Sequence, residues 1–189
     1  MRILIVDDES LIRMDLRDIL ESEQHEVVGE ASNGVEAITM CKELKPDAVL
    51  MDVKMPELDG IEAARQIGFD HLAPVVLLTS YSQQDLVTKA RESGVYGYLI
   101  KPVREEQLIP TLEMARGRFL DDVESRQQMA DLEKTLEERK LIQKATGILI
   151  DLYKITEDEA YNRIRQLSMK KRDSIASICK LIIQQASSN

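Results

Sequence analysis

The sequence lacks any long apolar run. No stretch of its 189 residues comes close to the roughly 20 consecutive apolar residues that a membrane-spanning helix needs. The apolar run at residues 3–6 is also too short to be the core of a signal peptide, because Asp7 and Asp8 follow it directly. We therefore expect a cytoplasmic protein with no membrane partner.

Cysteine and histidine are scarce as well. The two cysteines, Cys41 and Cys179, lie far apart in apolar helical patterns, which favours reduced thiols in a core over a disulfide or a metal site. The two histidines, His25 and His71, are isolated, and their spacing does not match that of metal ligands. We expect neither a disulfide nor a site with histidine or cysteine ligands.

Positive charge is sparse in the first part of the chain. The 25 basic and 34 acidic residues give a net charge of -9. Residues 1–115 hold 11 basic and 22 acidic side chains, whereas residues 141–189 hold 8 and 5. An acidic domain followed by a mildly basic one predicts two functions in one chain, the second directed at a polyanion.

Short apolar segments alternate with helical patterns over the first 116 residues. Strands are expected at residues 3–6, 26–30, 48–52, 74–79 and 96–100. Helices are expected from residue 10, from residue 34, at residues 60–68 and at residues 83–93. This alternation predicts an α/β fold, a doubly wound, flavodoxin-like sheet of five parallel strands with right-handed crossovers.

Polar side chains stand where four of these strands end. Asp7 and Asp8 follow the first strand, Asp52 ends the third, Thr79 ends the fourth, and Lys101 follows the fifth. The carboxyl ends of parallel strands share one edge of the sheet, so these side chains are expected to meet. Carboxylates with room for water suit Mg²⁺, and a lysine and a hydroxyl can hold phosphoryl oxygens. The set predicts phosphoryl transfer.

Residues 1–116 resemble the receiver domain of two-component response regulators. The resemblance rests on four motifs, Asp7-Asp8, Met51-Asp52-x-x-Met55-Pro56-x-x-Asp59-Gly60, Thr79-Ser80 and Lys101-Pro102. It implies that a sensor histidine kinase phosphorylates Asp52. It also implies that Asp8, Asp52 and the backbone carbonyl of Lys54 bind Mg²⁺ directly, with Asp7 assisting through water.

The same resemblance implies roles for three further residues. Thr79 and Lys101 would engage the phosphoryl group, and Tyr98 occupies the position of the aromatic switch residue. Phosphate on Asp52 would draw the Thr79 hydroxyl inward and leave space for Tyr98 to rotate in.

Residues 117–140 are expected to form a connector helix. No proline or glycine occurs between Gly117 and Gly147. Apolar residues recur at near-helical intervals, at positions 112, 115, 119, 123, 129, 132 and 136. The stripe skips residues 124–128, so an imperfect coiled coil that forms a dimer is expected, and a solvated linker helix is the alternative.

Residues 141–189 are expected to form a domain of three helices. The long helix should continue to about Tyr153, and Thr156 and Glu159 fit a capping box that starts the next helix. The apolar face of that helix is expected to use Ala160, Tyr161, Ile164 and Leu167. The last helix should bury Ile175, Ile178, Cys179, Ile182 and Ile183.

This tail resembles the ANTAR domain of transcription antitermination regulators, over about residues 136–187. The matching motifs are Ile142-x-x-Ala145-x-Gly147-Ile148-Leu149, Thr156-Glu157-x-Glu159-Ala160-Tyr161 and Ile164-Arg165-x-x-Ser168-Met169. Thr146 departs from the family, which usually has lysine there. The resemblance implies RNA binding, for which the candidate residues are Lys140, Gln143, Lys144, Thr146, Gly147, Arg165, Met169, Lys170, Lys171 and Arg172.

The two resemblances together predict a regulator that is not an enzyme. Phosphorylation of Asp52 would promote a homodimer that binds tandem stem-loops in nascent leader RNA and prevents termination, as in antiterminators of ethanolamine utilisation. The alternative is a response regulator that binds duplex DNA and acts on initiation. An enzymatic output is disfavoured because the tail has no histidine, catalytic carboxylate pair or phosphate-binding glycine loop. No small-molecule substrate is expected apart from the phosphodonor.

Overall fold

A computed structural model of the chain describes residues 1–80 and 94–187. It divides into two compact units, residues 1–124 and residues 125–189. The helix expected at residues 83–93 lies outside the described residues. Each unit is described by itself below.

The first unit contains a five-stranded parallel sheet, as predicted. Its strands are β1 (Arg2–Val6), β2 (Glu26–Ala31), β3 (Ala48–Asp52), β4 (Val75–Thr79) and β5 (Gly97–Ile100). Their order across the sheet is β2-β1-β3-β4-β5, with every pair parallel. β2 therefore lies on one side of β1, and β3, β4 and β5 lie on the other, which is the doubly wound arrangement.

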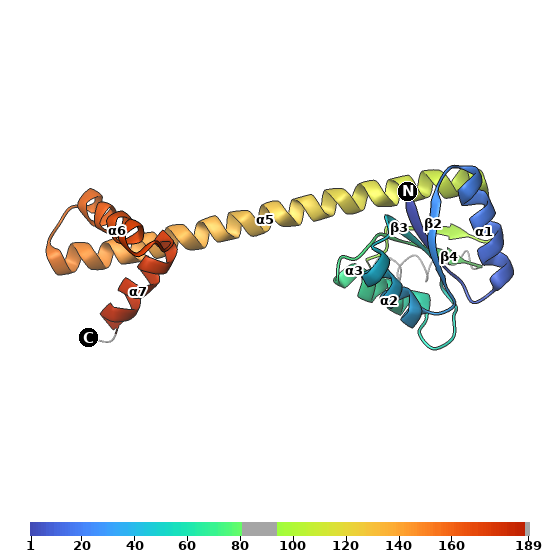
Figure 1. Cartoon of the computed structure of the whole chain (residues 1–189), viewed down its shortest axis with the longest axis horizontal. Helices are drawn as coiled ribbons and strands as arrows, with labels where there is room; N and C mark the ends of the chain where they lie inside the picture. Colours follow the sequence, from blue (N-terminus) through green and yellow to red (C-terminus); the bar gives the residue numbers. More distant parts are fainter. Residues whose placement is uncertain (81–93, 188–189) are drawn as a thin grey trace. The chain divides into compact units, whose positions relative to one another are not determined.

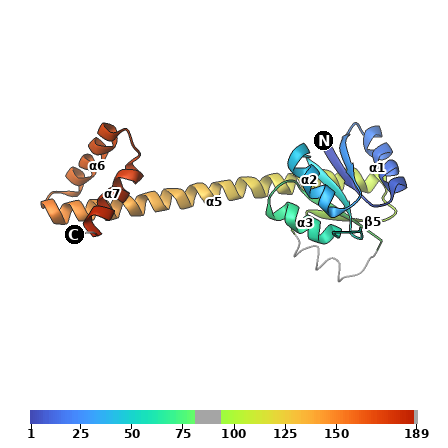
Figure 2. The same ribbon diagram turned by 60° about the horizontal axis from the view of Figure 1, so that its bottom comes forward.

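Helices cover both faces of this sheet (Figures 1 and 2). One face carries α2 (Gly34–Leu44) and α3 (Gly60–Phe69), and the other carries α1 (Ser10–Ser22) and the start of α5 (Glu105–Tyr153). Strand residues alternate between two cores: Val49 and Met51 pack with α2 and α3, whereas Ala48 and Leu50 pack with α1 and α5. Because both faces are covered, every residue of β3 and β4 is buried.

Hydrogen bonds and close backbone packing constrain the conformation of the turn after β3. Asp59 caps α3 by accepting a hydrogen bond from the backbone N–H of Glu62 at 2.9 Å. The backbone N–H of Gly60 donates to the carbonyl of Val53 at 2.9 Å. A Cβ atom on Gly60 would lie within 1.9 Å of the backbone oxygen of Asp52. Glycine is therefore required where α3 begins against the end of β3.

The second unit is a bundle formed by the end of α5, α6 (Glu157–Lys171) and α7 (Ile175–Ser187). The expected capping box at Thr156 and Glu159 is present. The core of the second unit contains Ala145, Leu149, Ala160, Ile164, Ile178 and Cys179. Both cysteines of the chain are free and buried, as predicted, and burial raises the pKa of the Cys41 thiol to about 12.

The expected apolar face of α6 was too wide. Ala160 and Ile164 are fully buried, but Tyr161 and Leu167 are 40% and 38% exposed. Ala160 and Ile164 are four residues apart, so they form the single row that faces the bundle, and Tyr161 lies about 100° around the helix from Ala160. A small bundle buries only that row.

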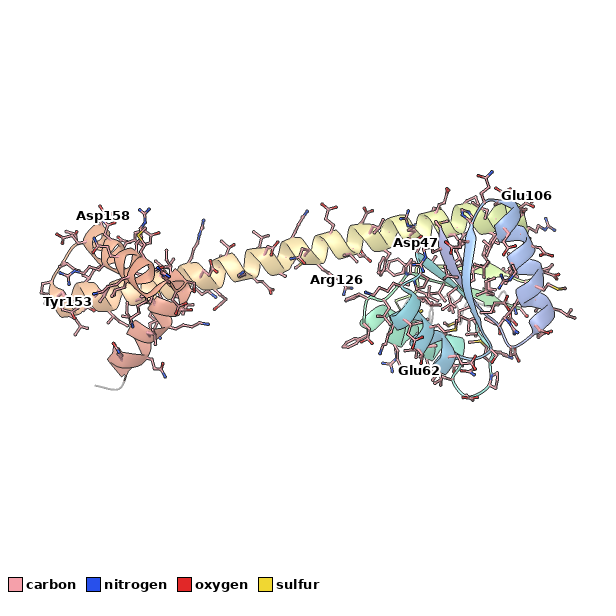
Figure 3. The ribbon with its side chains drawn as sticks, in the orientation of Figure 1. Asp47, Glu62, Glu106, Arg126, Tyr153 and Asp158 are labelled. Atoms are coloured by element: carbon pink, nitrogen blue, oxygen red, sulfur yellow. The ribbon has the colours of Figure 1, made fainter. Side chains whose placement is uncertain are left out.

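The expected apolar stripe of α5 divides into two parts. The helix starts at Glu105, and its residues Leu112 and Ala115 belong to the core of the first unit. Val123, Met129 and further apolar residues are exposed, and the labelled Arg126 in Figure 3 is another exposed residue of this middle part. Across the described residues, no helix combines the length and apolar content needed to cross a membrane.

Replacing Gly60 by alanine should destabilise the first unit, because the new methyl group would force the Asp52 carbonyl to move. We expect a loss of about 1–3 kcal/mol in the free energy of unfolding, measured by urea denaturation. Gly117→Ala is the matched control, since a Cβ there meets nothing within 4 Å. It should be neutral or stabilising by up to about 1 kcal/mol. Equal losses in both variants would contradict the steric argument.

Candidate functional site

Three charged side chains meet at the carboxyl edge of the sheet. Val6 of β1 pairs with Met51 of β3, so the next residues, Asp7 and Asp52, emerge side by side. Lys101 follows β5. Its Nζ lies 2.7 Å from Oδ2 of Asp7 and 2.5 Å from Oδ1 of Asp52. One ammonium group therefore bridges two carboxylates that are 94 and 49 residues away along the chain.

Backbone groups orient both carboxylates. The N–H of Lys54 donates to Oδ2 of Asp52 at 2.8 Å, and the N–H of Glu9 donates to Oδ1 of Asp7 at 3.0 Å. Arg13 also donates to the backbone oxygen of Asp7 at 2.7 Å while it pairs with Glu30 on β2. Sequence reasoning missed Arg13, because nothing in its helical pattern marks it as a contact of the site.

Burial controls the electrostatics here. The side chain of Asp7 is fully buried and residue Asp52 is 7% exposed. Burial raises the pKa of Asp52, and the negative charge of Asp7 adds to the rise, although Lys101 and the N–H of Lys54 act against it. Burial alone would lower the pKa of Lys101, but its contacts with Asp52 and Asp7 raise it. Lys101 is therefore held charged between the two acids.

The other predicted residues lie around this cluster. Asp8 is exposed, and within residues 1–80 and 94–187 no three acidic, histidine or cysteine side chains are grouped closely enough to hold a metal ion. The structure thus brings together two of the three predicted carboxylates, with Lys101 between them. Thr79 ends β4, is 6% exposed, and accepts the Lys101 N–H at its backbone oxygen at 2.8 Å. Tyr98, on β5, is 49% exposed.

Most of the predicted RNA-binding residues lie on the surface of the second unit. The exposed ones are Lys140, Gln143, Lys144, Arg165, Met169, Lys170, Lys171 and Arg172. Lys140 pairs with Glu137 at 2.9 Å. Gly147 is half-buried, and Thr146 is only 5% exposed. Thr146 therefore does not lie on an open surface with the others.

Lys101→Met should destabilise the first unit, because two buried carboxylates would face each other without a cation. The loss in the free energy of unfolding should be roughly 3 kcal/mol at neutral pH. The variant removes the cation that opposes the raised pKa of Asp52. The loss should therefore be full above the folded pKa of Asp52 and shrink as acid protonates it.

Lys42→Met is the matched control for this prediction. Lys42 pairs with Asp70 at 3.4 Å, and both side chains are about half exposed. Its loss should be no more than about 1 kcal/mol and nearly independent of pH. A comparable loss in the two variants, measured by denaturation at neutral pH and again in mild acid, would contradict the bridging role of Lys101.

Comparisons with known proteins match two separate parts of the chain. The response regulator receiver domain model matches residues 3–113, and the ANTAR domain model matches residues 130–183. The transcriptional regulatory protein PdtaR of Mycobacterium tuberculosis is 42% identical over 183 residues, which cover 97% of this chain and 89% of PdtaR. The chemotaxis protein CheY of Thermotoga maritima is 41% identical over 112 residues, 59% of this chain and 93% of CheY.

Solved structures agree with the fold of the first unit. The signal receiver domain of a modulated diguanylate cyclase from Desulfovibrio desulfuricans G20 matches with a TM-score of 0.59 and 33% sequence identity. The match covers 64% of this chain and 96% of the diguanylate cyclase domain. The receiver domain of a response regulator NarL from Mycobacterium tuberculosis matches with a TM-score of 0.58 and 29% sequence identity, over 61% of this chain and 96% of the NarL domain. The chain belongs to the two-component response regulators, with a receiver domain followed by an ANTAR domain.

Proposed function

We propose that a sensor histidine kinase phosphorylates Asp52, and that the ANTAR domain then binds stem-loops in nascent RNA and prevents transcription termination. The observation that carries the proposal is the pair of carboxylates, Asp7 and Asp52, gathered on Lys101 in the same chain as an ANTAR domain. The domain limits that we propose are residues 1–116 for the receiver, 117–140 for the connector and 141–189 for the RNA-binding domain. Control of ethanolamine utilisation is a finer proposal, which rests on the resemblance alone.

The geometry at Asp52 supports its role as phosphoacceptor. Oδ2 of Asp52 is held by the Lys54 N–H, and Oδ1 contacts Lys101. A phosphoryl group that bonds to the carboxylate would place its own oxygens beside the Lys101 ammonium. Thr79, buried at the end of the neighbouring strand, would supply a hydroxyl to the same group. Positioning and charge neutralisation are the main requirements of this reaction.

Asp7 and Asp52 supply donors that suit Mg²⁺, whereas Asp8 is exposed and is not grouped with them. The support is that Asp7 and Asp52 already contact one cationic group and carry the hard oxygen donors that Mg²⁺ prefers. In the proposal Asp8, Asp52 and the backbone carbonyl of Lys54 hold the ion, and Asp7 acts through water. When bound, Mg²⁺ neutralises charge between the carboxylate and the incoming phosphoryl group.

The proposed response runs through Tyr98 and the connector. The Tyr98 side chain is half exposed, and in the proposal it turns inward when Thr79 moves toward the phosphoryl group. The exposed apolar side chains of Val123, Met129, Leu132 and Leu136 would then be covered by a second copy of the chain. A solvated connector helix remains the competing arrangement, in which no dimer forms.

Asp52→Asn should abolish phosphorylation, because an amide cannot form the acyl phosphate. The measurement is incorporation of phosphate from acetyl phosphate and Mg²⁺, followed by mass spectrometry. Asp59→Asn is the matched control, since Asp59 is an exposed helix cap and asparagine caps equally well. Uptake of phosphate by Asp52→Asn at the wild-type stoichiometry would contradict the assignment of Asp52 as the phosphoacceptor.

Phosphorylated protein should bind an RNA with two hairpins about tenfold more tightly than unphosphorylated protein, a coupling of ordinary size. The affinity should fall steeply with salt, because lysine and arginine contacts release counterions. Gel shifts with the RNA and with duplex DNA of equal length, combined with light scattering for oligomeric state, provide the measurement. Tight binding of duplex DNA without RNA binding would favour the regulator of initiation instead.

A further inference from the structure

A pocket lies between α5 and α6 in the ANTAR domain, and one of its lining residues has a buried hydroxyl with no partner among the described residues. The pocket has a volume of about 450 Å³. Thr146 lines it, and this residue is 5% exposed. Its hydroxyl oxygen forms no hydrogen bond with any of the described residues. Buried polar groups nearly always have a partner, so this hydroxyl points to a ligand.

Other threonines in the described helices satisfy their hydroxyl groups within the helix. Thr39, Thr111 and Thr135 each donate to the backbone oxygen four residues earlier, at 3.1, 2.6 and 2.9 Å. Thr146 is also inside a helix, but it forms no such bond to a described residue. Its hydroxyl oxygen is itself buried, so a molecule in the pocket would reach it once the side chains that cover it shift.

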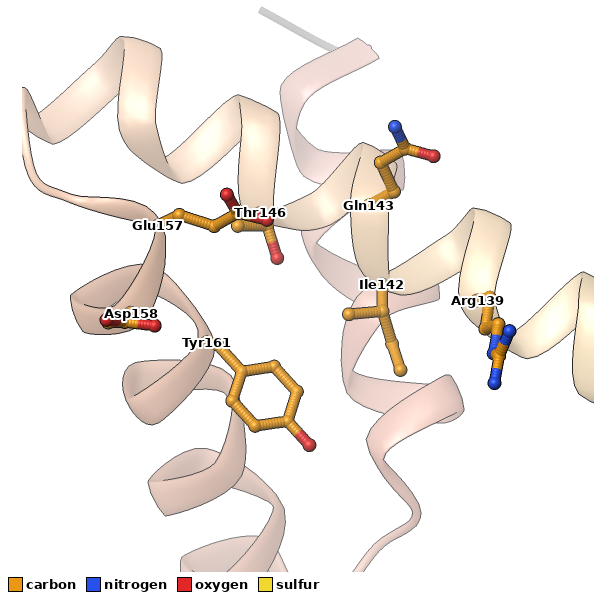
Figure 4. A pocket seen from close by; sticks show the side chains of 7 residues that line it. All are labelled: Arg139, Ile142, Gln143, Thr146, Glu157, Asp158 and Tyr161. Carbon is orange, nitrogen blue, oxygen red and sulfur yellow. The ribbon is translucent and has the colours of Figure 1, made fainter.

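The α5 wall carries side chains from one face of the helix. Arg139, Ile142 and Gln143 line the pocket together with Thr146, at spacings of three and four residues (Figure 4). Ile142 is half-buried and supplies an apolar surface, while Gln143 is exposed and can both donate and accept hydrogen bonds. The α5 wall therefore combines an apolar patch with polar groups of both kinds.

The α6 wall supplies an aromatic ring and two carboxylates. The Tyr161 ring extends from α6 toward α5, and Glu157 and Asp158 line the pocket at the start of α6 (Figure 4). A flat ring beside polar groups suits a heterocycle that stacks and forms hydrogen bonds at its edge. The carboxylates repel phosphate but accept hydrogen bonds from amino groups. Arg139 is the cation of the lining, placed for a neighbouring phosphate.

We propose that this pocket binds a nucleobase that carries an exocyclic amino group, presented unstacked by the loop of an RNA hairpin. The proposal rests on the proposed RNA-binding function and adds the position at which a base is read. Adenine, cytosine and guanine carry such an amino group, and uracil does not. A free nucleotide offers the same chemistry, and the experiment below separates the two sources.

The test starts from hairpins selected by the full-length phosphorylated protein from an RNA pool with a randomised loop. One loop position should be restricted to amino-bearing bases. Replacing that base by uridine should weaken binding to wild-type protein about tenfold, as for a single misread base. In Thr146→Val the same replacement should have less than about a twofold effect, because the hydroxyl oxygen that accepts a hydrogen bond from the amino group beside the carboxylates is gone.

Two further variants distinguish a loss of base discrimination from a loss of folded structure. Thr146→Ser keeps the hydroxyl and should retain discrimination against uridine. Thr135→Val removes the hydroxyl of an exposed threonine on the same helix and should bind like wild type. Circular dichroism of each variant checks the helices. Loss of discrimination in Thr135→Val, or its survival in Thr146→Val, would overturn the proposal.

The remaining outcomes are distinguished by the wild-type protein. If wild-type protein binds no hairpin, the proposed RNA-binding function fails. Titration with the four nucleoside 5′-monophosphates then tests the pocket alone: binding of an amino-bearing one that is lost in Thr146→Val supports a free nucleotide as the source. If wild-type protein binds hairpins without preference at any loop position and binds no monophosphate, the pocket proposal fails while RNA binding stands.

Discussion

The contact of one lysine ammonium with two buried carboxylates is the interaction on which the receiver domain depends. Asp7 and Asp52 leave adjacent strands, and Lys101 arrives from the far edge of the sheet. Burying both carboxylates at this place without a cation would cost stability, because two negative charges in a low dielectric repel strongly. The contact therefore ties the ends of β1, β3 and β5 into one arrangement, and any phosphoryl chemistry at Asp52 has to begin by competing for Lys101.

The convergence of these residues was predictable from the sequence, but their exact pairing was not. Strand ends of a parallel sheet share an edge, so Asp7, Asp8, Asp52, Thr79 and Lys101 were expected together. Which of two consecutive acids faces inward depends on the pleat and on the turn that follows β1. In the structure Asp7 is fully buried and Asp8 is exposed. Gly60 could be recognised as a turn residue, whereas its close approach to the Asp52 carbonyl needed coordinates.

The helical part shows the same limit in another form. Periodicity identified the apolar faces of α5 and α6, but it does not say how wide a face is buried or what covers it. Leu112 and Ala115 of α5 belong to the receiver core, and Ala145 and Leu149 of the same helix belong to the core of the ANTAR domain. Tyr161 of α6 was expected in a core and is instead partly exposed at the pocket. Which of these side chains are buried depends on their packing partners in the folded structure, and the sequence alone does not identify those partners.

The Thr146 hydroxyl, which has no hydrogen-bond partner among the described residues, has an evolutionary consequence. A domain selected only for stability would replace it with valine, which has the same shape and no polar atom to satisfy. Natural proteins depart from such local optima mainly where function requires it. In the proposed pocket, selection for thermostability and selection for ligand discrimination would therefore favour different residues at position 146. A library selected for heat resistance alone should drift toward an apolar residue there, whereas one selected for both properties should keep a hydroxyl.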